Sequence, residues 1–206
     1  MQQELETRGR PPIFCHDELV RIITEMFWSD GYKSLSINSI AKKLGLNRTS
    51  LYNSFKSKEN LLLECLDYYA EQSPTAKLFQ HQPQQNISGL LTQVLYQLCR
   101  ERANDPLKRG CLAANIYTEL ASDKSCAAKT ILDKNEARKK KMRLIIKRAI
   151  DQQELPPNTD PEICANVILS FMNGLNAHAK SGATEQEMKR MCDFFIEKIG
   201  FVSLNS

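Results

Sequence analysis

The chain has 206 residues, of which 42% are hydrophobic and 25% charged, and its formal net charge is +4. This composition excludes a largely disordered chain and suits one or two domains. The seven cysteines form no CxxC pair, which argues against a disulfide framework or zinc site and for a reducing cytosol. No apolar run approaches the roughly 20 residues needed to span a membrane, and the basic start lacks the apolar segment of a signal peptide. We therefore expect a cytoplasmic protein without a membrane partner.

The first residues carry an arginine pair that suits the minor groove of DNA. Arg8 and Arg10 flank Gly9 and precede Pro11-Pro12, so this segment is expected to form an extended arm with no competing helix. The potential of the minor groove attracts arginine side chains. The alternative is a terminus that is only solvated.

The following segments predict one helix and then a pair of shorter helices. An amphipathic helix is expected from about Asp17 to Ser29. Within Leu35–Phe55, apolar residues at helical spacing predict two short helices joined at Gly45, which suits a left-handed turn. Ser36 can cap the first of these, because its hydroxyl can accept an otherwise unpaired backbone N–H. Such a helix-turn-helix presents its second helix to the DNA major groove.

The outer face of that second helix is polar and basic, and it carries Arg48, Thr49, Tyr52 and Asn53. Thr49 and Asn53 lie one turn apart, so together with Arg48 they are expected to touch base edges. Tyr52 is expected to hold a phosphate. Residues 31–60 contain six basic residues and one acid, a net charge of +5, which is what phosphate neutralisation requires. The alternative is a solvated, lysine-rich helix pair in an ordinary core.

Another helix is expected to start directly after this pair. Ser57 is a plausible cap, and Lys58 lies in the first turn, where a cation is disfavoured by roughly 0.3–1 kcal/mol. The position makes sense if a DNA phosphate docks between Lys58 and the free backbone N–H groups. We therefore predict a DNA-binding domain over residues 1–57 and a second domain over 58–206.

Taken together, these motifs resemble the TetR family of bacterial transcriptional regulators over roughly the first third of the chain. The matching features are Gly31-Tyr32, Ser36 with Ile40-Ala41, Gly45, the SLYNSF block and the F-x-S-K-E-x-L start of the next helix. A shorter stretch, Arg109-Gly110-Cys111-Leu112 with Asn115 and Glu119, resembles the sixth helix of one branch of the family, which often carries the RGRP arm as well. The resemblance implies an all-α fold with a three-helix DNA-binding domain and a larger helical domain for effector binding and dimerisation.

Beyond Leu61 the chain is expected to be helical almost throughout. Expected helices cover about 58–72, 87–103, 111–120, 124–154, 161–181 and 184–201, which makes about nine helices in all and no strand. The stretch 79–86 is expected to be a surface connection. The basic run over 138–148 is expected on the exposed face of its helix, with a second phosphate-binding patch as the alternative.

The last two expected helices have apolar faces wider than one core requires. One contains Phe171 and the other Phe194. A helix-turn-helix reads about one half-site, so a two-fold dimer is needed to read two. The resemblance implies that these helices pair with their symmetry mates as a four-helix bundle. The alternative is that they only close the core of the monomer.

Candidate effector or sensor residues are Cys111, Asn115, Tyr69 and His178. Cys111 follows Gly110 at an expected helix start, where the helix dipole can stabilise a thiolate. It also occupies the cysteine of the motif described above, and the resemblance implies that Cys111 is a candidate electrophile sensor, because this region has that role in some relatives. The alternative is a small buried core residue. The three histidines are far apart, no catalytic motif stands out, and we expect no cofactor, no metal and no enzymatic activity.

The sequence thus predicts a homodimeric regulator, a repressor by base rate, that binds a palindromic operator in double-stranded DNA. A small molecule or a redox signal would release it by moving the fourth helix, a mechanism that the resemblance implies. The alternatives are a helical ligand-binding protein or enzyme and an architectural DNA-binding protein without an effector.

Overall fold

The computed structural model describes residues 14–80 and 85–201, and these form ten helices and no strand. The all-α expectation is confirmed, with one addition, the short α5, which at four residues is too brief to give a periodic signal. None of the described helices is both long and apolar enough to cross a membrane. The helices are α1 (His16–Asp30), α2 (Ile37–Leu44), α3 (Arg48–Phe55), α4 (Lys58–Gln72), α5 (Ala76–Phe79), α6 (Ile87–Ala103), α7 (Leu112–Leu120), α8 (Cys126–Asp151), α9 (Pro161–Lys180) and α10 (Glu185–Ile199).

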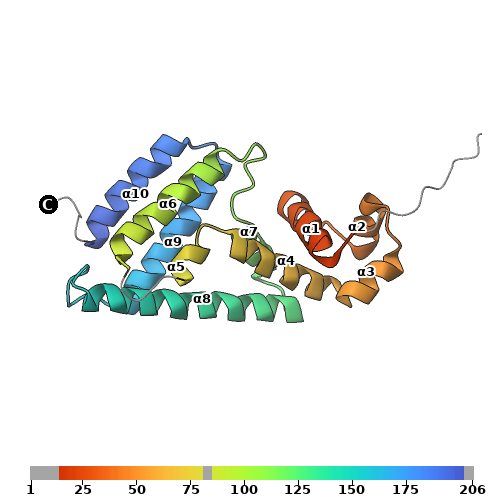
Figure 1. Cartoon of the computed structure of the whole chain (residues 1–206), viewed down its shortest axis with the longest axis horizontal. Helices are drawn as coiled ribbons and strands as arrows, with labels where there is room; N and C mark the ends of the chain where they lie inside the picture. The colour runs from red at the N-terminus through yellow and green to blue at the C-terminus, as the bar shows by residue number, and fades with distance from the viewer. Residues whose placement is uncertain (1–13, 81–84, 202–206) are drawn as a thin grey trace, which may run out of the picture.

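The helices α1 to α3 pack at one end of the elongated molecule, as Figure 1 shows. Their apolar stripes meet in a compact centre, where Ile23, Phe27, Ile40, Leu51 and Phe55 are each at most 1% exposed. Burial of this much apolar surface holds three short helices together that would be marginal alone.

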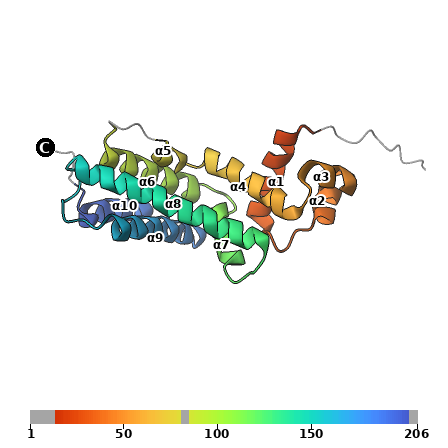
Figure 2. The ribbon, with the colours of Figure 1, turned by 90° about the horizontal axis from the view of Figure 1, so that it is seen from below.

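Two later helices share this core. Leu61, Leu62 and Cys65 of α4 are fully buried in it, and so are Leu112 and Ile116 of α7. The connection between the two ends of the molecule is therefore a packed one, with α4 running from the three-helix unit toward the bundle (Figures 1 and 2). The domain boundary after residue 57 stays a prediction, and core packing joins α4 and α7 to the N-terminal helices.

The second core lies in the bundle of α6, α8, α9 and α10, with α5 at its side. Val94 and Leu95 of α6, Ile146 of α8 and Ile168 of α9 are fully buried there, as is Met188 of α10. Both α9 and α10 begin at capping side chains, Asp160 and Thr184, which accept hydrogen bonds from backbone N–H groups of the first turn.

Candidate DNA-reading helix, cavity and pairing face

The turn between α2 and α3 has the geometry that its residues predict. The Ser36 hydroxyl accepts the Ser39 N–H at 3.1 Å, and the Ser39 hydroxyl in turn accepts the Ser36 N–H at 2.8 Å. Gly45 ends α2 in the left-handed conformation, at φ 64°, where a glycine is free of the steric cost of a Cβ. The Asn47 side chain caps α3 by accepting the Thr49 N–H at 2.9 Å. The start of α3 is therefore fixed by local hydrogen bonds.

All four residues expected to read DNA from α3 lie on its exposed side, and Ser36 is also exposed. The Arg48 guanidinium lies 5.0 Å from the centre of the Tyr52 ring, and its Nη2 donates to the phenol oxygen at 3.4 Å. The Tyr52 phenol and the Arg48 guanidinium are therefore held side by side on the exposed side of α3. Thr49 and Asn53 share an exposed face on the same helix. Arg8 and Arg10 lie outside the described residues.

Lys58 has surroundings that sequence pattern did not foresee. Its Nζ lies 3.9 Å from the centre of the Tyr32 ring, and the Tyr32 hydroxyl donates to Glu59 at 3.3 Å. Burial lowers the pKa of the Lys58 ammonium, while Glu59 and Glu119 oppose that shift. Ser57 caps α4 as expected, by accepting the Asn60 N–H at 3.1 Å. Lys58 is thus a half-buried cation held at the start of α4, beside the reading helix.

A cavity of about 990 Å³ opens among the six helices α4 to α9, and its volume is near the upper end of the sizes seen for ligand pockets. Three of the four predicted effector residues line it: Tyr69, Cys111 and Asn115. The fourth, His178, is not among the residues that line this cavity, and its role stays a prediction. On α9 the cavity side includes Asn173, Asn176 and Lys180, and His178 projects to another side of the helix, where it is exposed.

A buried polar network lines the cavity. Arg102 is 4% exposed, and it donates to the Tyr69 hydroxyl at 2.7 Å and to Asn176 Oδ1 at 3.2 Å. Burial, and after it the nearby Cys111, raises the pKa of the Tyr69 phenol above its ordinary value. Sequence reasoning missed Arg102, although it continues the apolar stripe of α6 one turn after Leu98.

Arg138 was expected on the exposed face of α8, and that prediction is wrong. Arg138 is half-buried and lines the cavity, because it lies on the inward stripe of α8, seven residues after Ile131 and four before Met142. Burial lowers the pKa of its guanidinium. The surrounding run of lysines hid this periodicity in the sequence.

The cavity wall touches the DNA-reading end at two points. Tyr69 packs edge-on against Trp28 of α1, with ring centres 5.1 Å apart, and the Arg109 guanidinium lies 3.9 Å from the centre of the Trp28 ring. Glu119 of α7, which also lines the cavity, accepts the backbone N–H groups of Tyr32 and Lys33 at 3.0 and 2.5 Å. Both contacts join residues far apart in sequence.

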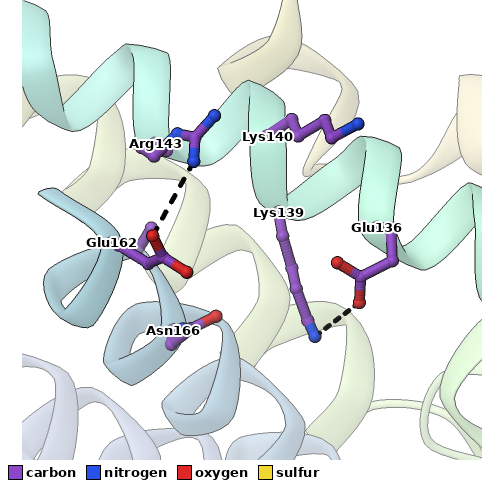
Figure 3. A pocket seen from close by; sticks show the side chains of 7 residues that line it. Glu136, Lys139, Lys140, Arg143, Glu162 and Asn166 are labelled. Carbon is purple, nitrogen blue, oxygen red and sulfur yellow. Dashed lines mark hydrogen bonds and ion pairs between the residues drawn. The ribbon is translucent and has the colours of Figure 1, made fainter.

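A second, smaller hollow of about 140 Å³ lies between α8 and α9 (Figure 3). Lys139 reaches Glu136 at 2.7 Å, and Arg143 faces Glu162 at 3.8 Å across the two helices. Each acid here has a cationic partner. Charge compensation of this kind marks an ion-paired helix seam, which contributes little to stability at an exposed surface.

Cys111 and the pair Cys99 and Cys192 lie in different environments. Cys111 is half-exposed at the start of α7, on the cavity wall. Cys99 and Cys192 are buried between α6 and α10, with their sulfurs 3.5 Å apart. The hydrogen bond between these two thiols lowers the pKa of Cys99 and raises that of Cys192. Sequence reasoning singled out Cys111 and missed the pair, because its members are 93 residues apart.

An exposed apolar face runs along α9 and α10. Ile163 and Val167 are 61% and 44% exposed, and Phe194 is 64% exposed. Phe171 stacks in parallel on Phe195 at the seam between the helices, with ring centres 3.9 Å apart. Gly174 lies on the same stripe of α9, and a Cβ there would meet no side chain and no other helix within 4 Å. The apolar residues of α9 thus divide into a side that faces the core and an exposed side. We call the exposed apolar face of Ile163, Val167 and Phe194, together with the half-buried Phe171, the pairing face.

Among the described residues, no group of three or more histidine, cysteine or acidic side chains gathers in a way that could hold a metal ion. The cavity wall contains polar and cationic groups, such as Arg102, Tyr69 and Asn176.

An exposed and capped helix-turn-helix, joined through α4 to a cavity, defines a helix-turn-helix regulator with a ligand-binding domain. Residues 21–65 match the model described as bacterial regulatory proteins, tetR family, and residues 91–195 match the tetracyclin repressor-like C-terminal domain. The chain belongs to the TetR family of bacterial transcriptional regulators. Its place in the branch with the GCL-type helix stays a prediction.

Individual relatives are distant. The HTH-type transcriptional repressor BdcR of Escherichia coli (strain K12) is 26% identical over 106 residues, which are 50% of this chain and 53% of that protein. The chain thus matches about half the length of this curated relative. The TetR-family regulator CifR, as a cysteine mutant with 26bp double-strand operator DNA, has a TM-score of 0.76 at 21% identity, over 92% of this chain and 98% of that one. Regulatory protein TetR from Rhodobacter sphaeroides has a TM-score of 0.71 at 21% identity, over 91% and 98%.

Proposed function

We propose that this protein is a homodimeric repressor that binds a palindromic operator and is released when an effector fills the cavity. The observation that carries the proposal is the physical continuity between cavity and reading end. Glu119 lines the cavity and also holds the backbone just before α2. Tyr69 likewise lines the cavity and packs on Trp28. DNA binding would take place in the cytoplasm.

The contacts suggest how release would occur. A ligand that displaces Tyr69 shifts α4 against α1, because the two helices share a core that resists continuous deformation. A shift of α7 changes the hold of Glu119 on Tyr32 and Lys33. Either movement reorients the reading helix relative to its mate in the dimer, and a fixed half-site spacing is then no longer matched.

Selection of binding sites from random double-stranded DNA by the full chain tests this function. We expect enrichment of a two-fold palindrome whose half-sites lie about one helical turn, or a multiple of it, apart. Binding without sequence preference would instead support an architectural DNA-binding protein. An enzyme would consume a ligand that copurifies in the cavity, whereas a regulator returns it unchanged, and mass spectrometry after incubation separates the two.

A redox signal is the second candidate for release, and one observation favours it, the 3.5 Å approach of Cys99 and Cys192. Cys111 remains the electrophile-sensor prediction. Peroxide treatment with mass mapping distinguishes the two sites. Release of DNA from Cys111→Ser at the wild-type peroxide dose contradicts a sensor role for Cys111. Release that persists in Cys99→Ser and Cys192→Ser contradicts a role for the buried pair.

A further inference from the structure

The charges around the large cavity are unbalanced. Six basic and two acidic residues line it. Both acids are already engaged, since Asp67 pairs with Lys134 at 2.5 Å and Glu119 accepts two backbone N–H groups. The wall therefore carries an excess of positive charge, unlike the ion-paired hollow of Figure 3.

Two guanidinium groups in this wall have no acidic partner among the described residues. Arg102 bonds to the neutral groups of Tyr69 and Asn176 and makes no ion pair. Arg138 makes no hydrogen bond and no ion pair in the described chain, although burial penalises its charge. An unpaired charge that is shielded from water is unfavourable, so a wall that holds the buried Arg102 and the half-buried Arg138 favours a counter-ion.

Both arginines line the cavity near Tyr69. Arg102 donates to the Tyr69 hydroxyl at 2.7 Å, and Tyr69 and Cys111, on the same wall, are near enough to act electrostatically on Arg138. Guanidinium groups present planar sets of donors that match the two oxygens of a carboxylate. The head of a ligand would therefore lie beside Tyr69.

Part of the wall is apolar. Leu66 and Ala70 of α4 line it, with Leu98 of α6, Ile131 of α8 and Leu169 of α9. Such a surface excludes a compact inorganic anion as the full occupant, because the volume of about 990 Å³ would stay unfilled along apolar side chains.

We propose that the effector is an amphiphilic carboxylate, whose carboxylate group binds Arg138 and Arg102 and whose apolar body lies along Leu66, Leu98 and Leu169. This inference rests on the proposed function, since it names the class of ligand for the effector cavity. Positive charge at the head site, together with an apolar wall, selects against neutral and cationic ligands of the same length.

Three probes of equal chain length test the charge preference: decanoate, decan-1-ol and decylammonium. Titration calorimetry on the full chain measures their affinities. Trp28, which is the single tryptophan and packs on Tyr69, reports binding independently by its fluorescence. We expect decanoate to bind at least about tenfold more tightly than decan-1-ol, and decylammonium to bind most weakly. Equal binding of decanoate and decan-1-ol, tighter binding of decylammonium, or no binding of any probe overturns the proposal.

A matched pair of variants on α8 assigns the effect to Arg138. Arg138→Gln is expected to bring the affinities for decanoate and decan-1-ol within about threefold of each other. Lys147→Gln, which removes an exposed charge from the same helix away from the cavity, is expected to keep the wild-type preference. An unchanged preference in Arg138→Gln overturns the proposal.

Thermal unfolding separates this role from a structural one. Without a probe, Arg138→Gln should unfold at a temperature no lower than Lys147→Gln, because it removes an unpaired, half-buried charge. A clear decrease would show that Arg138 supports the fold, and would overturn the proposal. Site selection on ligand-free protein keeps the two hypotheses apart: specific DNA binding without a decanoate preference refutes only the ligand class, and loss of specific DNA binding refutes the regulator itself.

Discussion

The DNA-reading end and the cavity differ in how far apart in sequence their contacting residues lie. At the reading end, α2 and α3 are fixed by residues within a few positions of one another, namely the Ser36 and Asn47 caps and the left-handed Gly45. At the cavity, neighbours such as Arg102 and Tyr69 are 33 residues apart, and the wall comes from six helices. The geometry of the reading turn is therefore set within one short segment, although α4 and α7 complete its core, whereas the cavity depends on the whole bundle.

The largest expected effect comes from a substitution in the exposed apolar face of α9 and α10. Loss of the dimer would weaken operator binding although no residue of the helix-turn-helix is changed. Phe194→Glu places a charge in the centre of an apolar interface, so we expect monomers in sedimentation and a loss of operator affinity of about 100-fold or more. Leu132→Glu, at an apolar residue of α8 that is 42% exposed, is the control and should stay dimeric. A wild-type protein that sediments as a monomer at micromolar concentration would remove the basis of the dimer.

The next effect tests the loop that supports the cavity. The Asp105 side chain is 5% exposed and accepts the Arg109 N–H at 2.8 Å and its Nε at 3.0 Å. Burial raises the pKa of Asp105, but the hydrogen bonds from Arg109 outweigh that effect and hold it below its usual value. Asp105→Asn should lower the free energy of unfolding by about 2–3 kcal/mol at pH 7.

The sign of the pH dependence follows from the lowered pKa of Asp105. A depressed folded-state pKa contributes stability above the unfolded value of about 3.9, and this is lost as pH falls through the folded value. Urea unfolding should show a constant gap between wild type and Asp105→Asn from pH 7 to pH 5, which closes below about pH 4. The exposed control Asp133→Asn should change the free energy by less than about 0.5 kcal/mol. A gap that widens in acid would contradict this account.

A third prediction separates two kinds of contact at the reading end. Asn53→Ala should cost about 1–3 kcal/mol of operator binding with little change on random DNA, because asparagine is suited to adenine. Lys58→Ala should weaken both DNAs similarly and reduce the salt slope by about one. Isotherms at several salt concentrations measure both, with the exposed Lys129→Ala on α8 as control. Equal loss on both DNAs in Asn53→Ala would refute base reading by that residue.

The smallest effect concerns the link between the two ends. Glu119→Gln replaces the carboxylate that holds the Tyr32 and Lys33 N–H groups with a weaker acceptor. The effector should then reduce operator affinity less than it does in the wild type. We expect the coupling free energy between effector and operator binding to fall by about 1 kcal/mol. Unchanged coupling would leave the packing of Tyr69 on Trp28 as the sole route between cavity and reading helix.

Sequence could predict the elements whose signals are local. Capping residues and apolar spacing located nine of the ten helices closely, and the Ser36 and Ser57 caps are confirmed. Arg138 was assigned to the wrong side of its helix, because a charge run on α8 does not by itself say which neighbour that helix will face.

The sequence could not predict the cavity, because the contacts that form its wall join residues far apart in the chain. The bonds of Arg102 to Tyr69 and Asn176 span 33 and 74 positions and have no signature within any one segment. The same holds for the approach of Cys99 to Cys192. Lys58 shows the limit at the reading end, where its position was predicted and its contact with the Tyr32 ring was not.

Gly174 has a consequence for how the protein responds to its own abundance. A glycine inside a helix costs about 1 kcal/mol relative to alanine, and no other helix of the described residues lies within 4 Å of the place of its Cβ to offset that cost. In the proposed dimer the bare backbone lets the symmetry-related helix approach closely, so the compensation comes only from a second subunit. Where subunits are mostly unpaired, the amount of reading-competent protein then rises with roughly the square of subunit concentration. Dilution of the protein as a cell grows would therefore relieve repression more steeply than in proportion.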